Sequence, residues 1–232
     1  MSGHATTLFA IGLTLAAYVG MRRLYLRYKH PLLNVVALGA ALIITVLVVL
    51  GIPYSAYVPA KDIMTSLLGP ATVGLAVPLY RHRGLLVRFG PAILGSVALG
   101  ALLAMLTAGV IAQLGGLPTD VVMSIMPKGV TIPFAVEIAR ICGGIPALTA
   151  AFVVATGTLG SLIGGWLLTL ARIQNPMARG LALGTVSHGQ GTATALMEGE
   201  QQGAMAGLAM ILAGIFTAGF APLVAWLLGR MG

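Results

Sequence analysis

Long runs of apolar residues alternate with short basic stretches along the chain. Three of these runs contain no Asp, Glu, Lys or Arg: Leu32–Pro53, Pro91–Pro118 and Cys142–Ala171. About 20 apolar residues in a helix cross a bilayer core of about 30 Å, so each run predicts a membrane span. The pattern therefore predicts an all-α fold, a polytopic bundle of transmembrane helices.

A weaker apolar run, Ala5–Val19, precedes the first basic stretch, which begins at Arg22. No basic stretch stands before this run and no small-residue cleavage site follows it, unlike a signal peptide. We expect a retained first helix whose C-terminal end is cytoplasmic. Leu32–Ile52 then predicts a second helix, and Pro53–Lys61 a short outer loop.

Three further apolar segments are interrupted by proline, glycine or polar residues, and each is followed by an uninterrupted one. The interrupted segments are Asp62–Tyr80, Thr119–Arg140 and Met177–Gln201, and the whole helices after them are Pro91–Leu114, Ile145–Leu170 and Ala204–Leu228. The three units recur at a period of roughly 60 residues. We expect residues 1–60 to form a scaffold, and residues 61–232 a transport core, within one membrane domain.

The interruptions lie at Gly69-Pro70, at Met126–Gly129 and again at Pro133, and at Ser187–Gly191. Proline inside a helix removes a backbone hydrogen bond, and irregular backbone at membrane depth requires a setting lined by protein or water. The interruptions therefore predict discontinuous helices around a buried site.

Basic residues constrain the topology. If Thr119–Arg140 crossed the membrane, Arg172 and Arg179 would lie outside, which the positive-inside rule disfavours. If that segment instead re-enters from the outer side, these arginines are cytoplasmic and Met177–Gln201 enters from inside. The two broken segments would then meet near the midplane, as in transporters with inverted repeats. The sequence leaves both alternatives open.

Composition and charge exclude other classes of protein. Of the 232 residues, 58% are hydrophobic and 8% are charged, against roughly 25% charged in soluble proteins. The net charge of +8 comes from basic residues in short loops between apolar runs, which is typical of membrane orientation and not of nucleic-acid binding. The chain has one cysteine and no hydrolase, zinc-peptidase or phosphate-binding-loop motif, so we expect no enzyme activity and no cofactor. The expected location is the cell (inner) membrane.

Lys128 is the first candidate for a binding residue. Its distance in sequence from Asp120 and Arg140 places it inside the apolar layer. A charge within the membrane is costly unless it is paired, and it marks a candidate functional site. The ligand of an ammonium group is an anion. In the alternative interpretation, Lys128 pairs with Glu137 or Glu198 and stabilises the bundle.

Gly129 and Thr131 adjoin Lys128 at the start of a predicted half-helix. Gly129 allows other groups to approach the backbone, and Thr131 lies three residues beyond Lys128, on the same face. Free N–H groups at a helix start favour a carboxylate or phosphate. Together these groups predict an anion site. The alternative for Thr131 is a hydroxyl that bonds back to its own helix.

A second polar cluster lies midway between the flanking charges of the last broken segment. Its members are Ser187, His188, Gly189, Gly191 and Thr192. His188 could donate to a substrate oxygen or carry a coupled proton, because imidazole titrates near neutral pH. The alternative is a buried histidine that only satisfies a hydrogen bond.

Three further predictions concern single residues near the breaks. Thr72, beside Gly69-Pro70, is the last substrate-binding candidate. Glu137 and Arg140 have the i,i+3 spacing of a structural ion pair on a helix. Glu198, near the end of its segment, is interpreted as a solvated interface residue.

At these clusters the sequence resembles the LrgB/CidB family, which includes the plastid glycolate/glycerate translocators. The resemblance rests on Leu68–Val73, Met126–Pro133, Gly143–Ala150, and Arg179–Thr185 continuing into Ser187-His188 and Gly191–Ala193. It covers nearly the whole chain after about residue 30.

Some candidate residues match the family pattern and others depart from it. Those that match are Lys128, Thr131, Ser187, His188 and Thr192. The family usually has serine at position 129, a second threonine at position 132 and often a basic residue at position 194. This chain has Gly129, Ile132 and Thr194, so side-chain contacts are not carried over to those positions.

The resemblance implies two kinds of function. Bacterial members have been named as antiholin-like proteins that control murein hydrolase activity and cell lysis, acting with a small LrgA/CidA-type membrane partner. Plastid members carry small hydroxy-carboxylates, and bacterial relatives have been linked to pyruvate or related acids. We expect a secondary transporter of small monocarboxylates such as glycolate, glycerate, lactate or pyruvate, and a homodimer through the N-terminal helices. The alternative is a non-transporting regulator of lysis.

Overall fold

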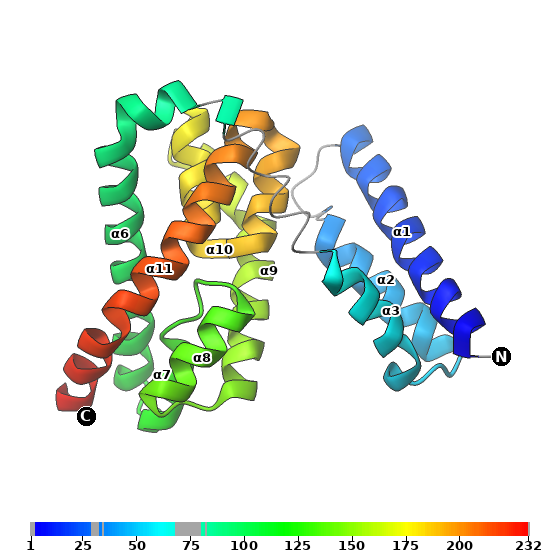
Figure 1. Ribbon diagram of the computed structural model, residues 1–232, viewed down its shortest axis with the longest axis horizontal. Helices are drawn as coiled ribbons and strands as arrows, with labels where there is room; N and C mark the ends of the chain where they lie inside the picture. Colours follow the sequence, from blue (N-terminus) through cyan, green and yellow to red (C-terminus); the bar gives the residue numbers. More distant parts are fainter. Residues whose placement is uncertain (1–2, 29–32, 34, 68–79, 82, 232) are drawn as a thin grey trace. The chain divides into compact units, whose positions relative to one another are not determined.

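The structure, a computed structural model, describes residues 3–28, 33, 35–67, 80–81 and 83–231. In these ranges the chain forms nine α-helices and no strand, which confirms the all-α prediction. Cα positions divide the chain into two compact units, Met1–Leu75 (unit 1) and Ala76–Gly232 (unit 2), whose helices are labelled in Figure 1. The predicted division into scaffold and transport core at residue 60 stays a prediction.

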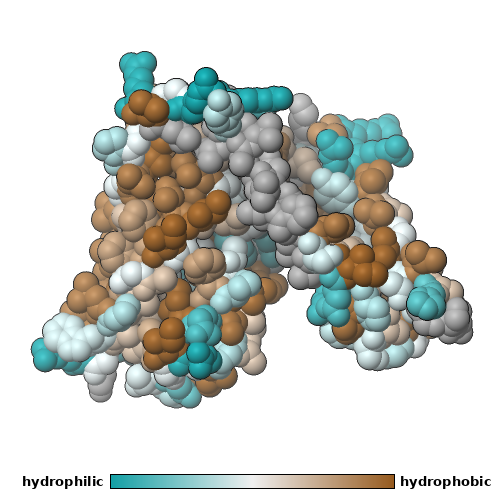
Figure 2. Space-filling view, viewed as in Figure 1, coloured by the Kyte–Doolittle hydropathy of each residue, from teal (hydrophilic) through white to brown (hydrophobic). Residues whose placement is uncertain are grey.

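Within the described ranges, four helices are long and apolar enough to cross a membrane. They are α1 (Gly3–Tyr28), α6 (Arg83–Leu114), α9 (Pro146–Leu170) and α11 (Glu200–Met231). Hydrophobic side chains cover much of the visible surface of α6 and α11 (Figure 2), and Ile111 and Trp226 are examples that are more than half exposed. Such exposure is unfavourable in water and natural in lipid. The chain is therefore a multi-pass membrane protein.

Unit 1 contains α1, α2 (Val35–Val49) and α3 (Tyr54–Ser66). The described part of α2 has 15 residues, or about 22 Å, less than the bilayer core of about 30 Å. It ends before the predicted Ile52, in a turn where Gly51 has φ +64°. The apolar run therefore predicted the helix, which ends three residues before the predicted Ile52.

The predicted outer loop over residues 53–61 is wrong, because this stretch begins α3. Pro59 lies inside this helix. The proline removes one backbone hydrogen bond, and packing of the neighbouring residues offsets this loss. Ala60 is fully buried, and the hydroxyl of Tyr57 lies 2.9 Å from the Thr14 hydroxyl on α1. Packing on α1 thus overrides the local preference.

Helix α6 begins at Arg83, earlier than the predicted Pro91, so Arg83 and Arg88 belong to the helix and not to a loop. Its first turns lie at an angle to the rest of the helix (Figure 1). Pro91 accounts for such a bend, because its ring displaces the preceding turn and it donates no hydrogen bond.

The predicted break after Thr119 is confirmed. Helix α7 (Thr119–Ile125) is followed by irregular residues 126–131 and then by α8 (Ile132–Cys142). The chain leaving α8 returns beside α7, since the backbone N–H of Ile145 donates to the Ser124 hydroxyl at 2.7 Å. We call residues 119–142 the first hairpin and residues 126–131 the first tip.

Pro133 was predicted to break the helix a second time and does not. It lies in the first turn of α8, where the N–H group that proline lacks would have no partner within the helix. Proline therefore starts α8 instead of interrupting it.

Helix α10 (Pro176–Glu198) doubles back on itself. Its residues Arg179 and Glu198 are 19 positions apart, which in a straight helix is about 28 Å, yet their side chains are 2.7 Å apart. The backbone leaves helical geometry at His188, which confirms the predicted break there. We call α10 the second hairpin and residues 187–191 the second tip.

The long helices of unit 2 fix the directions of the two hairpins. Arg81 pairs with Glu200 at 3.1 Å, and Gln113 Nε2 donates to the Leu228 carbonyl at 2.5 Å, so α6 and α11 begin at one end and finish at the other. Arg179 donates to Thr169 at the C-terminal end of α9. The second hairpin therefore begins and ends beside the starts of α6 and α11. The first hairpin begins and ends near the start of α9, at the opposite end.

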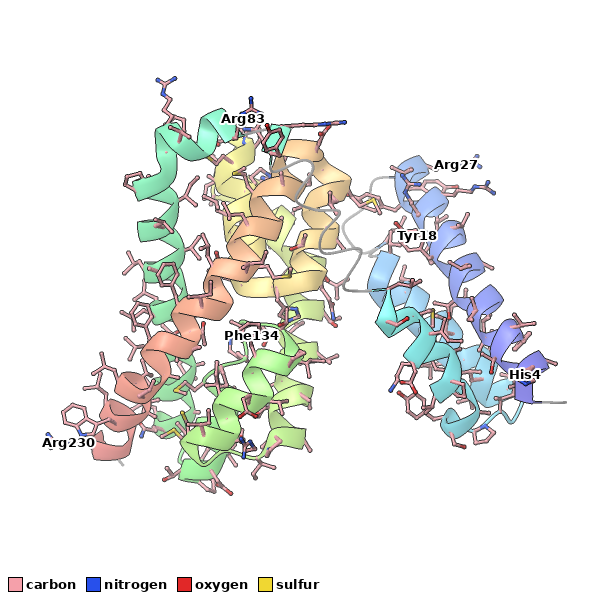
Figure 3. All side chains as sticks on the ribbon, in the orientation of Figure 1. His4, Tyr18, Arg27, Arg83, Phe134 and Arg230 are labelled. Carbon is pink, nitrogen blue, oxygen red and sulfur yellow. The ribbon has the colours of Figure 1, made fainter. Side chains whose placement is uncertain are left out.

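The described charges are distributed unequally between these two ends. One end carries Arg81, Arg83, Arg88, Arg172 and Arg179 against Glu198 and Glu200, whereas the other carries Arg140 and Arg230 against Glu137 and Asp120. Figure 3 shows Arg83 and Arg230 at opposite ends of unit 2. We call the first of these the basic end.

Glycines allow the second hairpin to pack closely on α11. A Cβ atom at Gly184 would lie 2.7 Å from the Cα and carbonyl carbon of Ala206, and one at Gly180 would contact the Gln202 carbonyl oxygen. These neighbours are backbone atoms, which cannot rotate away. Small residues at such positions are the usual basis of helix association in membranes.

We predict that Gly184→Ala lowers the stability of the protein by about 1–3 kcal/mol, because the added methyl group displaces the backbone of α11. Gly219→Ala is the matched control, since a Cβ atom there meets no atom within 4 Å. Thermal unfolding in detergent, followed by circular dichroism, measures the effect. Equal Tm values for the two variants would contradict this packing.

Candidate functional site

The first tip contacts the turn that precedes the second tip, within unit 2. A Cβ atom at Gly129 in the first tip would lie 3.7 Å from the carbonyl oxygen of Thr185 and 3.9 Å from that of Val186. Both carbonyls belong to the last turn before His188. Groups from two breaks that are distant in sequence therefore border one region.

The second tip is shaped by an unusual backbone conformation at His188. Its φ of 42° and ψ of −128° lie outside the helical region, and such conformations in residues other than glycine cost about 1–3 kcal/mol. The carbonyls before His188 and the N–H groups after it have lost their usual helical partners. The Thr192 hydroxyl donates to the His188 carbonyl, one turn earlier in the chain, at 2.9 Å.

The His188 ring is held by α9. The side chain is buried, and Nε2 lies 3.1 Å from the carbonyl oxygen of Val153. A carbonyl oxygen only accepts, so Nε2 carries a proton. The ring packs on Gly157, where a Cβ atom would come within 2.5 Å of Cε1. Nδ1 makes no hydrogen bond to the described residues, so only one of the two ring nitrogens of His188 has a partner among them.

The other predicted residues of the second tip have different environments. Ser187 is buried against Gly160 of α9. The Thr192 hydroxyl donates to the His188 carbonyl. We call the parts of α10 before and after His188 its first and second limbs, and they meet where Gly191 lies against the Leu183 carbonyl. Gly189 is exposed, and a Cβ atom there would meet open space. Gly189 is therefore the part of the tip most accessible to a ligand.

The first tip is anchored by apolar side chains and presents Lys128. Met126, Pro127 and Val130 are buried, whereas Lys128 and Gly129 are half-buried. The backbone N–H of Lys128 donates to the Ile125 carbonyl at 3.1 Å, which holds the backbone of the tip at this residue.

Thr131 is the N-cap residue of α8, and its hydroxyl makes no capping bond. The alternative interpretation, a hydroxyl that bonds back to its own helix, has no such hydrogen bond in its support among the described residues. Its backbone carbonyl accepts from Ala135 at 3.0 Å, while the N–H groups of Ile132 and Phe134 have no helical partner. An ammonium group, a hydroxyl and the positive end of a helix dipole favour an anion.

The acids considered as partners of Lys128 are paired elsewhere. Glu137 binds Arg140 through two hydrogen bonds of 2.6 and 3.0 Å, which confirms the predicted structural pair. Glu198 binds Arg179 and not Lys128. Among the described residues, no ion pair involves Lys128, and no hydrogen bond joins it to the second tip.

The interpretation of Glu198 as a solvated residue is wrong. Its side chain is 17% exposed and accepts from Arg179 at the start of the same helix. Linear spacing places the two far apart, and only the fold of α10 brings them together. Thr72 lies outside the described residues.

The contribution of α9 to the site was not predicted from the sequence. Val153, Gly157 and Gly160 contact the second tip, and the buried Ser161 lies 3.5 Å from the side-chain oxygen of Gln190. The small residues at positions 157, 160, 161 and 164, which share one face of the helix at i,i+3 and i,i+4 spacing, were the available signal. They indicate a face of α9 against which another element packs closely.

A metal site and an apolar groove are the other kinds of site that unit 2 could offer. No three His, Cys, Asp or Glu side chains of the described residues lie close enough to hold a metal ion. An apolar groove of about 470 Å³ lies between α8 and α11, beside Phe134 (Figure 3). Its lining residues are Pro133, Phe134, Glu137, Ile138, Ile141, Cys142, Ala218, Ala221 and Pro222. None of the predicted site residues belongs to this set.

The fold and the contact between the two hairpins define a multi-pass membrane protein with polar residues where two broken helices meet. Residues 14–227 match the LrgB-like family, and the chain belongs to that family. This confirms the resemblance found in the sequence.

Relatives align along nearly their full lengths. The uncharacterized protein YxaC of Bacillus subtilis (strain 168) is 37% identical over 227 residues, covering 98% of this chain and 99% of that protein. The holin-like protein CidB of Staphylococcus aureus is 30% identical over 224 residues, covering 97% and 98%. No solved structure matches the chain.

We predict energetic coupling between Gly157 and His188. Gly157→Ala places a methyl group against the imidazole and should lower the free energy of unfolding by about 1–3 kcal/mol. In a His188→Ala background the cost should fall by at least about 0.5 kcal/mol, because the clash is gone. Denaturant unfolding of the single and double variants in detergent gives the coupling.

Gly95→Ala on α6 is the control, because a Cβ atom there meets no atom within 4 Å. It should show neither the loss of stability nor the coupling. Additive effects of Gly157→Ala and His188→Ala would mean that the ring does not pack on α9 as described.

Proposed function

We propose that this protein is a secondary transporter of small monocarboxylates such as glycolate, glycerate, lactate or pyruvate, in the cell (inner) membrane. The observation that carries the proposal is the contact between Gly129 of the first tip and the turn before the second tip inside unit 2, with the half-buried Lys128 next to Gly129 in the chain. Among the described residues this cation has no acidic partner, so an anionic ligand would supply its missing countercharge.

The arrangement of helices supports a transporter built from inverted repeats. A hairpin followed by a whole helix occurs twice, as the first hairpin with α9 and as the second hairpin with α11. The two hairpins start from opposite ends of unit 2, as re-entrant segments of opposite orientation do. The positive-inside rule assigns the basic end to the cytoplasm, so the second hairpin enters from the cytoplasm and the first from outside.

In this proposal the substrate carboxylate binds Lys128 and the N–H groups at the start of α8. The Thr131 hydroxyl adds a donor to the same oxygen atoms. The second tip contacts the hydroxyl or oxo group of the substrate through the backbone of Gly189 and Nδ1 of His188. Ser187, Gly191 and Thr192 act indirectly, because they hold the tip against α9 and against its own first limb.

The transport cycle follows from the position of the site. Each hairpin separates the site from the end at which it enters, so movement of one hairpin at a time gives alternating access. His188 is the proposed proton carrier, since a proton on Nδ1 would change its charge at the site. A homodimer through the helices of unit 1 would hold a scaffold while unit 2 moves.

A second candidate function has one observation in its favour, the similarity to a protein named holin-like. A non-transporting, antiholin-like regulator of murein hydrolase activity would act by assembly with a small LrgA/CidA-type membrane protein. In that function Lys128 is a structural cation. A carboxylate would then not stabilise the protein, whereas the transporter should gain thermal stability from glycolate, and should lose that gain in Lys128→Ala.

We predict that Lys128→Ala reduces the uptake of radiolabelled glycolate and pyruvate into proteoliposomes by tenfold or more. A charge-assisted bond of about 1.5–3 kcal/mol is lost, which corresponds to roughly 10–150-fold. Lys61→Ala is the matched control, since Lys61 is exposed on α3 and paired with Asp62. It removes the same charge and should leave uptake within about twofold of wild type.

Two outcomes of the uptake measurement would contradict this prediction. Equal uptake by wild type and Lys128→Ala would remove Lys128 from the substrate site. If folded wild-type protein moves neither acid under any imposed pH gradient, the transporter proposal fails and the regulator becomes the better account.

A further inference from the structure

One ion pair in unit 2 differs from the others that the described residues form. The Arg179–Glu198 side chains are 12% and 17% exposed, whereas both members of the pairs at Lys61, Arg81 and Arg140 are at least 46% exposed. Nε and Nη2 of Arg179 each donate to one carboxylate oxygen at 2.7 Å. This two-bond fork is the strongest geometry available to such a pair.

Arg179 uses every donor that it has. Besides the two bonds to Glu198, Nη2 donates to the Gly165 carbonyl at 3.0 Å, and Nη1 donates to the Ile173 carbonyl at 2.9 Å and to the Thr169 hydroxyl at 3.2 Å. A guanidinium group has five N–H bonds, and all are occupied. The residue therefore joins the first limb of α10, the second limb and the C-terminal end of α9.

These bonds lie at the base of the second hairpin, far from its tip. Arg179 is in the first turns of α10 and Glu198 is its last residue. The chain connects the two limbs at His188. Close to that turn, the limbs also pack together where Gly191 lies against the Leu183 carbonyl. A change in the spacing of the limbs at the base would therefore change the position of the tip.

We propose that Arg179 and Glu198 are positioning residues for the anion site, an inference that rests on the proposed transport function. Together they form a clasp that sets the position of the second tip against α9, and of the turn before it against Gly129. Neither residue touches the substrate. Loosening the clasp moves His188 and Gly189 away from the position in which they meet a bound acid, and weakens binding.

The first test measures glycolate uptake kinetics in proteoliposomes. Arg179→Lys keeps the charge and loses the fork, while Glu198→Gln keeps the shape and loses the charge. Each should raise the KM for glycolate about tenfold, as expected for a displaced binding group, while the maximal rate per folded protein changes much less. If Arg179→Lys does not fold, Glu198→Gln carries the test.

The matched controls are Arg140→Lys and Glu137→Gln. These residues form an ion pair with the same two-bond geometry, exposed and within one helix. Both should keep the wild-type KM. An unchanged KM in both clasp variants, or an equal increase in the controls, would overturn the proposal.

A second readout reports the position of the tip without transport. Gly189→Cys in a Cys142→Ala background places one thiol at an open position of the tip. Arg179→Lys in this background should change its rate of reaction with a maleimide, and Arg140→Lys should not. No change with Arg179→Lys would also overturn the proposal. If that rate changes while the wild-type protein takes up no acid, the clasp stands and the proposed function fails.

Discussion

Inside a bilayer every backbone N–H and C=O group needs a partner from the protein, because no water is available to supply one. An interrupted helix is therefore possible only where neighbouring elements surround it. In this chain α9 has that role. It accepts a hydrogen bond from His188 through the Val153 carbonyl, and its glycines allow both Ser187 and His188 to approach its backbone. The position of the second tip, and so of the candidate site, depends on this contact.

The same requirement explains why glycine is abundant in unit 2. At Gly184 the neighbouring atoms are the backbone of α11, and at Gly144 they are the backbone of α7, so side chains would separate the elements. Helices in lipid gain little from burying apolar surface, because the lipid tails are equally apolar. Close contact between backbones, and hydrogen bonds such as the one that the Ile145 N–H donates to the Ser124 hydroxyl, must hold the hairpins in place instead.

Charge is used differently at the ends of unit 2 and in its interior. At the basic end, arginines exceed acids, and the buried pair of Arg179 with Glu198 closes the second hairpin. Near the tips the described residues provide donors and a cation without a nearby acid partner. A structural ion pair neutralises itself, whereas an unpaired cation beside free N–H groups leaves a place for a small anion. This difference separates the proposed substrate residues from the proposed positioning residues.

The sequence by itself determined the membrane class, the long apolar helices and the two breaks that lie in the described residues, at 126–131 and at His188, because these depend on apolar length and on local helix breakers. It also identified Glu137 with Arg140, whose spacing of three residues is local. It did not determine that Pro53–Lys61 belongs mostly to α3, or that Arg179 pairs with Glu198 across one folded helix. Nor did it show that Val153 and Gly157 border the site. These features arise from contacts between residues distant along the chain, which only the tertiary structure brings within a few ångströms of each other.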